Sequence, residues 1–377
     1  LIQPPSSYLR ENYPLGLAFL GAVLEKNGHE VMALDASAKR RPLGVRDIKN
    51  LLSKFRPDLI GITIVTPLVK GAYLLAGELK SLGVPIMAGG THATLIPEEA
   101  LKNNFDIVAR GEGEETILDL VRFAKGELEL SEIKGISFVN KAGKIVNNSA
   151  RPYITNLDSI PIPARHLFPL ENYSLKSEST VDDYWTILSS RGCPNECIYC
   201  SSAQGPFGRR FRSRTPGNIY EEIVSLKKNH NINFLTFYDD TLTVNKARLI
   251  ELCSLISKDK SLGIRWDCDS RLDILDDELL LAMKSAGCYH LYFGMESYDA
   301  QTLSKIKKGL TQEKIDRGIA LVKKHNIDFT LYLIMGWPWE NEANVNQTAG
   351  FIRKIDDGRK FFHVFFVPIP YPGTELY

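Results

Sequence analysis

Short apolar runs alternate with amphipathic stretches along the first third of the chain. Apolar runs bounded by turn residues are typical of buried strands, whereas apolar residues three or four positions apart indicate helices that bury one face. We expect strands at 30–35, 58–65, 84–89 and 106–109, after a first strand that ends at 1–3, and helices at 15–26, 45–55, 69–82 and 114–123. This alternation predicts an open, doubly wound α/β domain with a parallel sheet, over residues 1–148, that ends in a hairpin at 136–146.

The same rhythm resumes at residue 184 and repeats six times. Strands are expected at 184–189, 234–238, 264–269, 290–294, 328–335 and 362–367, with helices that begin near 215, 245, 276, 299 and 341. Consecutive strand–helix units predict a partial TIM-type (β/α)6 barrel over residues 184–377. A proline-rich stretch at 149–183 is the expected linker. Because the sequence begins without Met and stops at Tyr377 after a Pro-Gly turn, we expect a chain that is trimmed, with a truncated C-terminus.

Length, net charge and the lengths of the apolar runs exclude several classes of protein. With 377 residues the chain exceeds the size of an ordinary single core, which favours two domains. A formal net charge of +1 without a long basic run argues against nucleic acid or an anionic membrane as the main partner. Apolar runs are strand-sized, so we expect no stable membrane insertion, and free cysteines suit a reducing compartment. The expected location is the cytoplasm.

Three cysteines, Cys193, Cys197 and Cys200, lie within eight positions and are the main candidates for chemistry. Three thiolates on one loop can hold three irons of an iron–sulfur cube and leave the fourth iron without a protein ligand. The alternative is a structural zinc knuckle, which takes four ligands, but the closest histidines are His166 and His230. A disulfide framework suits short secreted chains better. The loop directly follows the first barrel strand, where a barrel carries its active site.

Small residues follow the strands of the first domain, in the loops 63–67, 89–94 and 110–114. Open α/β sheets bind ligands beyond the carboxyl ends of their strands, and glycine lets the backbone approach a large flat or phosphate-bearing group. The alternative is that these glycines only make tight turns. A nicotinamide-binding domain is disfavoured, because no GxGxxG follows the first strand.

At these residues the chain resembles the radical S-adenosylmethionine (SAM) superfamily, whose signature CxxxCxxC has an aromatic residue before its last cysteine, here Tyr199. The first domain is similar to that of the subgroup with an N-terminal cobalamin-binding domain. The segments that carry the likeness are 15–20, 28–31, 89–94, 110–114, 190–194, 239–241, 286–288, 294–297 and 372–374. The cobalamin-ligating DxHxxG pattern is absent, as is common in this subgroup, so the resemblance implies that no imidazole of the domain ligates cobalt.

The resemblance also implies which residues bind the cofactors. Cys193, Cys197 and Cys200 would hold a [4Fe–4S] cluster whose open iron chelates SAM, and one-electron reduction by a flavodoxin or ferredoxin would cleave SAM to a 5′-deoxyadenosyl radical. By position, the SAM pocket would include Tyr199, Tyr238, Asp239, Arg271, Glu296 and Gly336. The cobalamin site would include Thr66, Gly89, Gly90, His92, Gly111 and Glu112.

Within that pocket, Tyr238 and Asp239 stand where the family binds the methionine amino group, often through a GGE motif that is absent here. Arg271 would pair with the carboxylate and Glu296 with the ribose, while the adenine would pack on the backbone at Gly336. The alternatives are an Asx-type turn for Asp239, a surface ion pair for Arg271 and a structural barrel carboxylate for Glu296.

The activity implied by the resemblance is methylation of an unactivated carbon or phosphorus centre of a small molecule, with methylcobalamin as methyl donor. One alternative is a cobalamin-dependent radical cyclase, as in the anaerobic tetrapyrrole cyclase of this subgroup. Another is a non-catalytic sensor that binds cobalamin or a cluster, although a complete barrel with the cysteine loop at its active face speaks against it. A related domain can also keep the fold and lose cobalamin.

Overall fold

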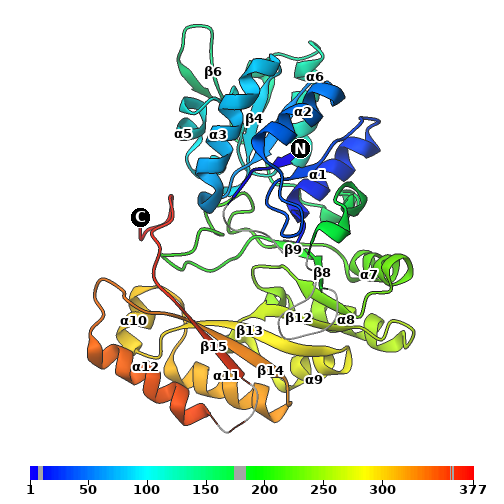
Figure 1. Cartoon of the computed structure of the whole chain (residues 1–377). Coiled ribbons are helices and arrows are strands. Elements are labelled where there is room, and N and C mark those ends of the chain that lie inside the picture. Colours follow the sequence, from blue (N-terminus) through cyan, green and yellow to red (C-terminus); the bar gives the residue numbers. More distant parts are fainter. Residues whose placement is uncertain (7–11, 174–183, 357, 359–360) are drawn as a thin grey trace. The chain divides into compact units, whose positions relative to one another are not determined.

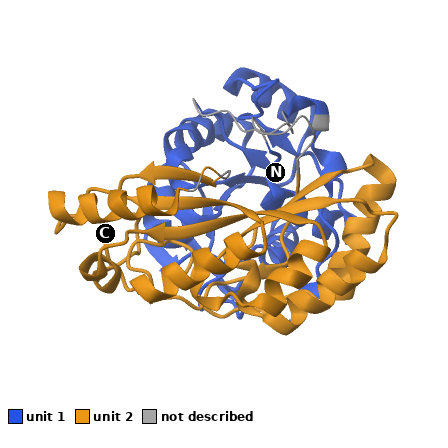
Figure 2. Ribbon diagram, turned by 90° about the horizontal axis from the view of Figure 1, so that it is seen from below, with its two compact units in different colours: residues 1–181, 204–208 blue, residues 182–203, 209–377 orange. Residues whose placement is uncertain are grey.

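The computed structural model describes residues 1–6, 12–173, 184–356, 358 and 361–377 (Figure 1). The chain divides into two compact units, residues 1–181 with 204–208 and residues 182–203 with 209–377 (Figure 2). Part of the expected linker, 174–183, lies outside the described residues. Every helix in the described ranges is too short or too polar to cross a membrane.

The sheet of the first unit has seven strands in the order β2-β1-β3-β4-β5-β6-β7. Five of them run parallel: β1 (Ile2–Gln3), β2 (Leu34–Asp35), β3 (Ile60–Thr63), β4 (Ile86–Gly89) and β5 (Ile107–Ala109). The expected hairpin follows as the antiparallel pair β6 (Ile136–Val139) and β7 (Ile145–Asn147). Because the strand order reverses between β1 and β3, the doubly wound sheet is confirmed, and its switch point lies there.

Helices cover both faces of this sheet. They are α1 (Leu15–Lys26), α2 (Val45–Phe55), α3 (Val69–Leu79), α4 (Thr91–Leu95), α5 (Pro97–Lys102) and α6 (Glu114–Ala124). On one face Leu52 and Leu75 join a core with the strands, and on the other Leu24 and Leu120 do so. The short helices α4 and α5 were not expected, because each is only a turn or two long and carries little periodic signal.

The second unit is a curved sheet of six parallel strands in the order β15-β14-β13-β12-β11-β8. The strands are β8 (Tyr184–Ile187), β11 (Phe234–Phe237), β12 (Arg265–Ser270), β13 (Cys288–Glu296), β14 (Asp328–Ile334) and β15 (Phe361–Phe366). Each strand pairs with its neighbours in chain order. The predicted partial (β/α)6 barrel is therefore confirmed.

The helices of the second unit are α7 (Pro216–His230), α8 (Lys246–Lys258), α9 (Asp277–Ser285), α10 (Ala300–Lys305), α11 (Gln312–Lys324) and α12 (Glu342–Ile355). Five begin at the expected positions because a short polar side chain caps each one: Thr215, Asn245, Asp276, Asp299 and Asn341 accept a hydrogen bond from a backbone N–H of the first turn. Helix α11 was missed, although Thr311 caps it in the same way.

A two-stranded ribbon was also missed. Strand β9 (Ser190–Arg191) pairs antiparallel with β10 (Arg212–Ser213). Two residues a strand are too few for a period-two pattern to be visible in the sequence. The ribbon brings together the two ends of the segment that contains the cysteines.

Candidate functional site

The cysteine loop leaves the barrel just after β8 and β9. Gly192 opens it with a φ of 85°, a conformation that favours glycine. Inside the loop the Cys200 N–H donates to the Cys197 carbonyl at 3.3 Å, and the Ile198 N–H donates to the Ile306 carbonyl at 3.2 Å. All three cysteines are free and partly exposed. The backbone of the loop is thus anchored while its thiols stay accessible.

The surroundings of the thiols suit an anionic cluster. The amide Nδ2 of Asn195 donates to Cys193 Sγ at 3.1 Å. Burial raises the pKa of the Cys200 thiol, so its thiolate form needs a metal or a cation nearby. Among the described residues no three His, Cys, Asp or Glu side chains surround a single point suited to one metal ion. Each thiolate of a four-iron cube binds a separate iron, and three on a short loop are the donor set that such a cube takes.

Tyr199, inside the loop, is tied to two charged residues of the barrel. Its hydroxyl donates to Glu296 Oε1 at 2.8 Å, and Lys308 Nζ lies 2.9 Å from the same oxygen and 3.2 Å from the tyrosine hydroxyl. Burial would lower the pKa of Lys308, but Glu296 and the Cys197 thiolate outweigh it and raise that pKa. Burial and Glu296 raise the pKa of Tyr199. This buried triad fixes the aromatic ring beside Cys200.

Lys308 was not among the predicted residues. It lies in the segment between α10 and α11, a part of the chain where no strand end was expected. Lys308 comes twelve residues after Glu296 in the sequence. A single sequence does not show that the chain folds back there and brings the two side chains together.

Arg271 directly follows β12 and is held in place on two sides. Its Nε and Nη2 each lie 2.9 Å from an Asp273 carboxylate oxygen, and Nη2 also donates to the Lys308 carbonyl at 2.8 Å. Burial lowers the pKa of Arg271, but Asp273 and the Cys197 and Cys193 thiolates raise it overall. Arg271 therefore forms a buried ion pair rather than the surface pair considered above, and it adds a second positive charge close to the thiols.

Asp239 follows β11 and is 1% exposed. It accepts hydrogen bonds from the Ser189 N–H at 3.1 Å, the Ser189 hydroxyl at 2.7 Å and the Ser190 hydroxyl. Arg248 donates to the Ser189 carbonyl at 2.9 Å and to its hydroxyl at 3.0 Å. Burial raises the pKa of Asp239, and Arg248 with the serines opposes this rise. The carboxylate thus holds the segment that enters the cysteine loop, whereas the neighbouring Tyr238 is 45% exposed.

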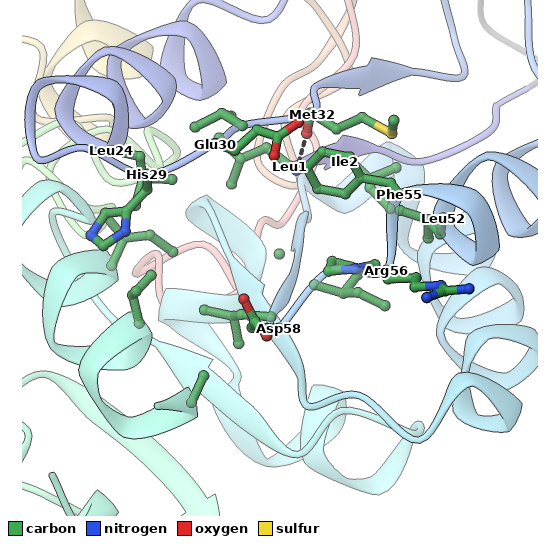
Figure 3. Close-up of a pocket in the computed structure, with 18 of the residues that line it drawn as sticks. Leu1, Ile2, Leu24, His29, Glu30, Met32, Leu52, Phe55, Arg56 and Asp58 are labelled. Carbon is green, nitrogen blue, oxygen red and sulfur yellow. Dashed lines mark hydrogen bonds between the residues drawn. The ribbon is translucent and has the colours of Figure 1, made fainter. Parts of the chain in front are cut away.

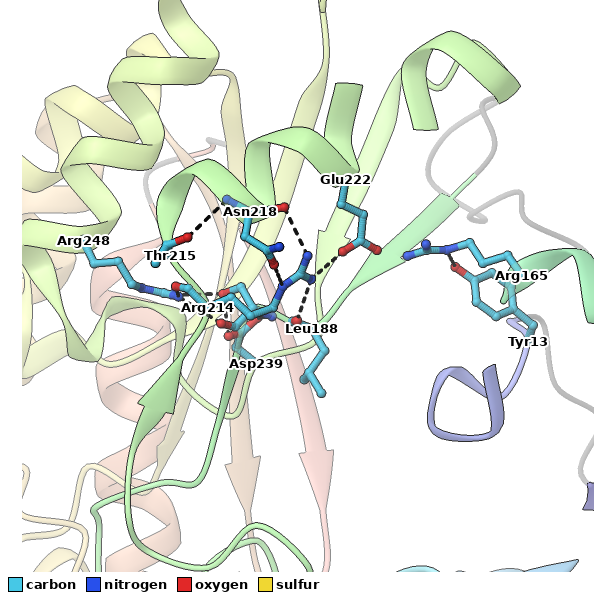
Figure 4. A network of polar contacts seen from close by, with 10 residues as sticks. Tyr13, Arg165, Leu188, Arg214, Thr215, Asn218, Glu222, Asp239 and Arg248 are labelled. Carbon is cyan, nitrogen blue, oxygen red and sulfur yellow. Dashed lines mark hydrogen bonds and ion pairs between the residues drawn. The ribbon is translucent and has the colours of Figure 1, made fainter. Parts of the chain in front are cut away.

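A buried ion pair supports the other end of the ribbon. Arg214, just after β10, contacts Glu222 of α7, and its Nε donates to Asn218 Oδ1 at 2.7 Å (Figure 4). The Arg214 N–H donates to the Ser189 carbonyl at 2.9 Å. Arg214 therefore joins α7 to the segment that leads from β8 into the ribbon.

Gly336 follows β14 with a φ of 93°, and its N–H donates to Glu340 Oε2 at 2.6 Å. The next residue, Trp337, packs edge-on against Tyr199 with ring centroids 5.5 Å apart. The turn at Gly336 therefore lies close to the aromatic residue of the cysteine loop. A flat ring could stack near this turn, and the adenine assignment stays a prediction.

In the first unit the loops after β3, β4 and β5 lie at one edge of the sheet. Thr63 pairs with Gly89, the Ile64 N–H donates to the Gly89 carbonyl at 2.7 Å, and the Gly111 N–H donates to Thr94 Oγ1 at 3.1 Å. A Cβ at Gly89 or Gly111 would meet no atom within 4 Å. Bare backbone beside open space is what a large planar cofactor needs, so these loops fit a corrin.

Three predicted cobalamin residues instead bind other parts of the first unit. Thr66 Oγ1 lies 3.2 Å from His92 Nδ1, and the His92 ring is buried, with Nε2 3.6 Å from Glu99. Burial lowers the pKa of His92 despite Glu99, so the ring is neutral near pH 7. Glu112 is buried and accepts from the Ile154 N–H at 2.8 Å. Thr66, His92 and Glu112 thus support the shape of the loops.

A cavity of about 190 Å³ lies at the opposite edge of the first sheet (Figure 3). His29, Met32 and Asp58 line it, and these residues precede β2 and β3, at their amino ends. The cavity therefore does not belong to the loops that fit cobalamin.

Two family models match the chain. The one described as the Radical SAM superfamily matches residues 187–352, and the one described as the B12 binding domain matches residues 7–121. The first range begins at the end of β8 and includes the cysteine loop. The second range includes α1 and the strands β2 to β5 with the loops after β3, β4 and β5.

Similar proteins extend over nearly the whole chain. A Pyrococcus horikoshii protein named as an uncharacterized methyltransferase is 35% identical over 368 residues, which cover 97% of this chain and 77% of that protein. The anaerobic magnesium-protoporphyrin IX monomethyl ester cyclase of Rubrivivax gelatinosus is 28% identical, covering 97% of this chain and 65% of the cyclase. The solved structure of the radical SAM methyltransferase TsrM of Kitasatospora setae, with cobalamin and a [4Fe–4S] cluster bound, has a TM-score of 0.80 at 19% identity. The match covers 100% of this chain and 76% of TsrM. At that identity TsrM shows the fold alone, and the chain spans 65–77% of these three proteins.

Proposed function

Because the chain belongs to the radical SAM superfamily, in the subgroup with an N-terminal B12-binding domain, we propose that it methylates an unactivated carbon or phosphorus centre of a small molecule. The observation that carries this proposal is the cysteine loop at the carboxyl end of the first barrel strand, with Lys308 and Arg271 beside its thiols. In the proposed reaction the [4Fe–4S] cluster and SAM would supply a 5′-deoxyadenosyl radical, and cobalamin would supply the methyl group.

The residues of the barrel would prepare the site for this chemistry. Cys193, Cys197 and Cys200 would hold the cluster, and the cations Lys308 and Arg271 would offset its negative charge and that of the SAM carboxylate. Both side chains are nearly buried, so water screens these charges little.

Around the nucleoside of SAM, the proposed contacts are the ring of Tyr199, the carboxylate of Glu296 and the backbone at Gly336, whereas the exposed Tyr238 would lie near the methionine amino group. The triad distances and the Tyr199–Trp337 contact support the first three of these assignments. Asp239 would act through Ser189 and Ser190, which it holds, rather than by contact with the methionine amino group.

In the first unit, Gly89, Gly90 and Gly111 would line the corrin with backbone atoms. Thr66, His92 and Glu112 would keep these loops in shape, since Thr66 and His92 bind each other and Glu112 binds the Ile154 N–H. A buried, neutral His92 agrees with the absence of a DxHxxG ligand, because this imidazole already faces Thr66 and Glu99.

A cyclase is the second candidate, because the Rubrivivax gelatinosus cyclase aligns with the chain over 97% of its length. The methyltransferase-named relative is more similar, at 35% against 28% identity, and favours methylation. We also propose a flavodoxin or ferredoxin as electron donor and a location in the cytoplasm, for which the six cysteines without a disulfide are the support.

The test is anaerobic reconstitution with iron, sulfide and cobalamin, followed by incubation with SAM, a reductant and a cell extract of small molecules. Radical chemistry predicts 5′-deoxyadenosine, and methylation predicts transfer of the SAM methyl group to a small molecule. Formation of 5′-deoxyadenosine with a dehydrogenated or cyclised product and no methyl transfer would favour the cyclase. If a reduced, intact cluster released no 5′-deoxyadenosine, the radical activity itself would be refuted.

A further inference from the structure

The interior of the barrel carries a row of polar side chains that the cofactors do not explain. Alternate residues of a barrel strand face inward. On β12, Trp266 and Cys268 are fully buried in the outer core, which leaves Asp267 and Asp269 on the other face. Asp267 pairs with Thr236 of β11 and His290 of β13, and Asp269 pairs with Tyr292 of β13.

The electrostatic effect of Asp267 and Asp269 on Tyr332 agrees with an inward-facing position of these side chains. Burial and then Asp269 and Asp267 raise the pKa of Tyr332, which lies on β14, two strands away from β12. Burial also raises the pKa of Asp269 to about 7, with further contributions from Asp267 and Asp240, while Lys308 opposes the rise. Only the concave side of the sheet brings these strands within reach of one another.

One group of this interior has no partner in the described part of the chain. Thr236 is 9% exposed, and its Oγ1 has no hydrogen bond among the described residues. Buried polar groups are almost always paired in native proteins, so the unpaired Thr236 hydroxyl, beside the partly exposed carboxylate of Asp269 on the adjacent strand, points to a ligand.

The walls of this space suit a cation. Tyr292 and Tyr332 stack with ring centroids 5.8 Å apart, and aromatic faces attract positive charge. Burial lowers the pKa of His290 to about 4, so its ring adds no positive charge near pH 7. Its Nε2 lies 2.8 Å from Thr330 Oγ1. Asp240, Asp267 and Asp269 make the local charge predominantly negative.

We propose that Asp269 binds a protonated amino group of the methyl acceptor inside the barrel, and that Thr236 hydrogen-bonds to the same molecule. This inference rests on the proposed methylation and gives its substrate a class: a small amine that is cationic near pH 7. The amino group would then add to the positive charge of Lys308, which already acts on Asp269. An uncharged lipid-like acceptor would leave the Thr236 hydroxyl unpaired and Asp269 without a cation, at a cost that disfavours it.

The probe is a small-molecule extract of the cells that encode the protein, divided on a cation exchanger at about pH 5, where amines stay protonated. Each fraction is incubated with the reconstituted enzyme, a reductant and SAM labelled in its methyl group. We expect label to enter molecules of the retained, cationic fraction. Label only in the unretained fraction would overturn the proposal. If neither fraction were labelled while 5′-deoxyadenosine formed, the proposed methylation would fail, and this inference with it.

Variants separate substrate binding from SAM chemistry. Asp269→Asn and Thr236→Val should reduce methyl transfer, the former by about tenfold or more because a buried charge loses its partner. Formation of 5′-deoxyadenosine without acceptor should stay within about twofold of the wild type, a span worth well under 1 kcal/mol. The matched control Glu251→Gln, on an exposed face of α8, should change neither.

Two results would refute the assignment. Equal loss of 5′-deoxyadenosine in Asp269→Asn would place Asp269 in the SAM pocket instead, and unchanged methyl transfer in both variants would exclude the interior as the amine site. Cluster absorbance and circular dichroism check that each variant is folded. Should Asp269→Asn fail to fold, Thr236→Val decides alone, because it keeps the shape of the side chain and removes only the hydroxyl.

Discussion

Lys308 is the clearest case in which one side chain connects the cysteine loop to the barrel. Its ammonium group touches both Tyr199 and Glu296, and its carbonyl accepts from Arg271. Removing it would leave the carboxylate of Glu296 buried next to the thiols without its cation. Replacing Lys308 should therefore change both the stability of the fold and the properties of the cluster.

We predict that Lys308→Met lowers the free energy of unfolding by about 3 kcal/mol, because it breaks a buried ion pair on one side. It should also weaken SAM binding, measured as the loss of the SAM-induced change in the electron paramagnetic resonance spectrum of the reduced cluster. The surface variant Lys258→Met serves as control. The double variant Lys308→Met/Glu296→Gln should regain part of the stability, since both charges are gone. Wild-type stability in the single variant would contradict the prediction.

Asp269 gives a second prediction at this scale, through its pKa of about 7 against the ordinary value of 3.8. The folded protein holds the proton of Asp269 more tightly than the unfolded chain, so stability falls as pH rises from about 4 to about 7. Asp269→Asn removes this loss. The variant should therefore melt above the wild type at pH 8, and this advantage should shrink at pH 5. An advantage that grew toward acid pH would have the wrong sign and disprove the raised pKa of Asp269.

At the scale of elements, Gly89 and Gly90, at the end of β4, allow a test of the proposed cobalamin site. Gly90 has a φ of 91°, and a Cβ there would lie 2.8 Å from the Ile64 carbonyl oxygen, whereas a Cβ at Gly89 would meet nothing within 4 Å. Gly90→Ala should lower the melting temperature and abolish corrinoid binding. Gly89→Ala should keep the fold and weaken corrinoid binding alone, as titrated by absorbance. Tight corrinoid binding by both variants would move the cofactor away from these loops.

Elements were predictable where a local signal and the fold agree. The helix starts at Thr215, Asn245, Asp276, Asp299 and Asn341 were found because a capping side chain acts on its own first turn. The ribbon β9–β10 was missed because its two strands are held together by pairing across twenty residues, which leaves no mark on either strand.

The site shows the same division. The cysteines and Tyr199 could be recognised because their spacing is the signal. Asp239 was placed correctly at the end of its strand, but the serines that take up its oxygens could not be foreseen. Gly336 could be found because it closely follows the end of a strand. Lys308 was missed because it lies in the segment after α10, where no strand end marks it.

At the scale of the whole molecule, the two units have separate cores and should keep separate cofactors. We predict that Cys197→Ala abolishes the cluster absorbance and the cleavage of SAM, because a three-thiolate site loses one iron ligand. Corrinoid binding by the first unit should remain within about twofold of wild type, a change well under 1 kcal/mol. A full four-iron cluster in the variant, counted by iron and sulfide analysis, would refute the ligand assignment.

The order of strands in the second unit has a consequence for how the site comes into being. Each strand pairs with the one made just before it, so the sheet can grow unit by unit while the chain is synthesised from its N-terminus. The thiol loop follows β8, the first of these strands, whereas Glu296 ends β13, the fourth, and Lys308 comes after it. The thiols are thus made before their cation, and a cluster can meet its finished surroundings only once β13 and the segment after it have folded.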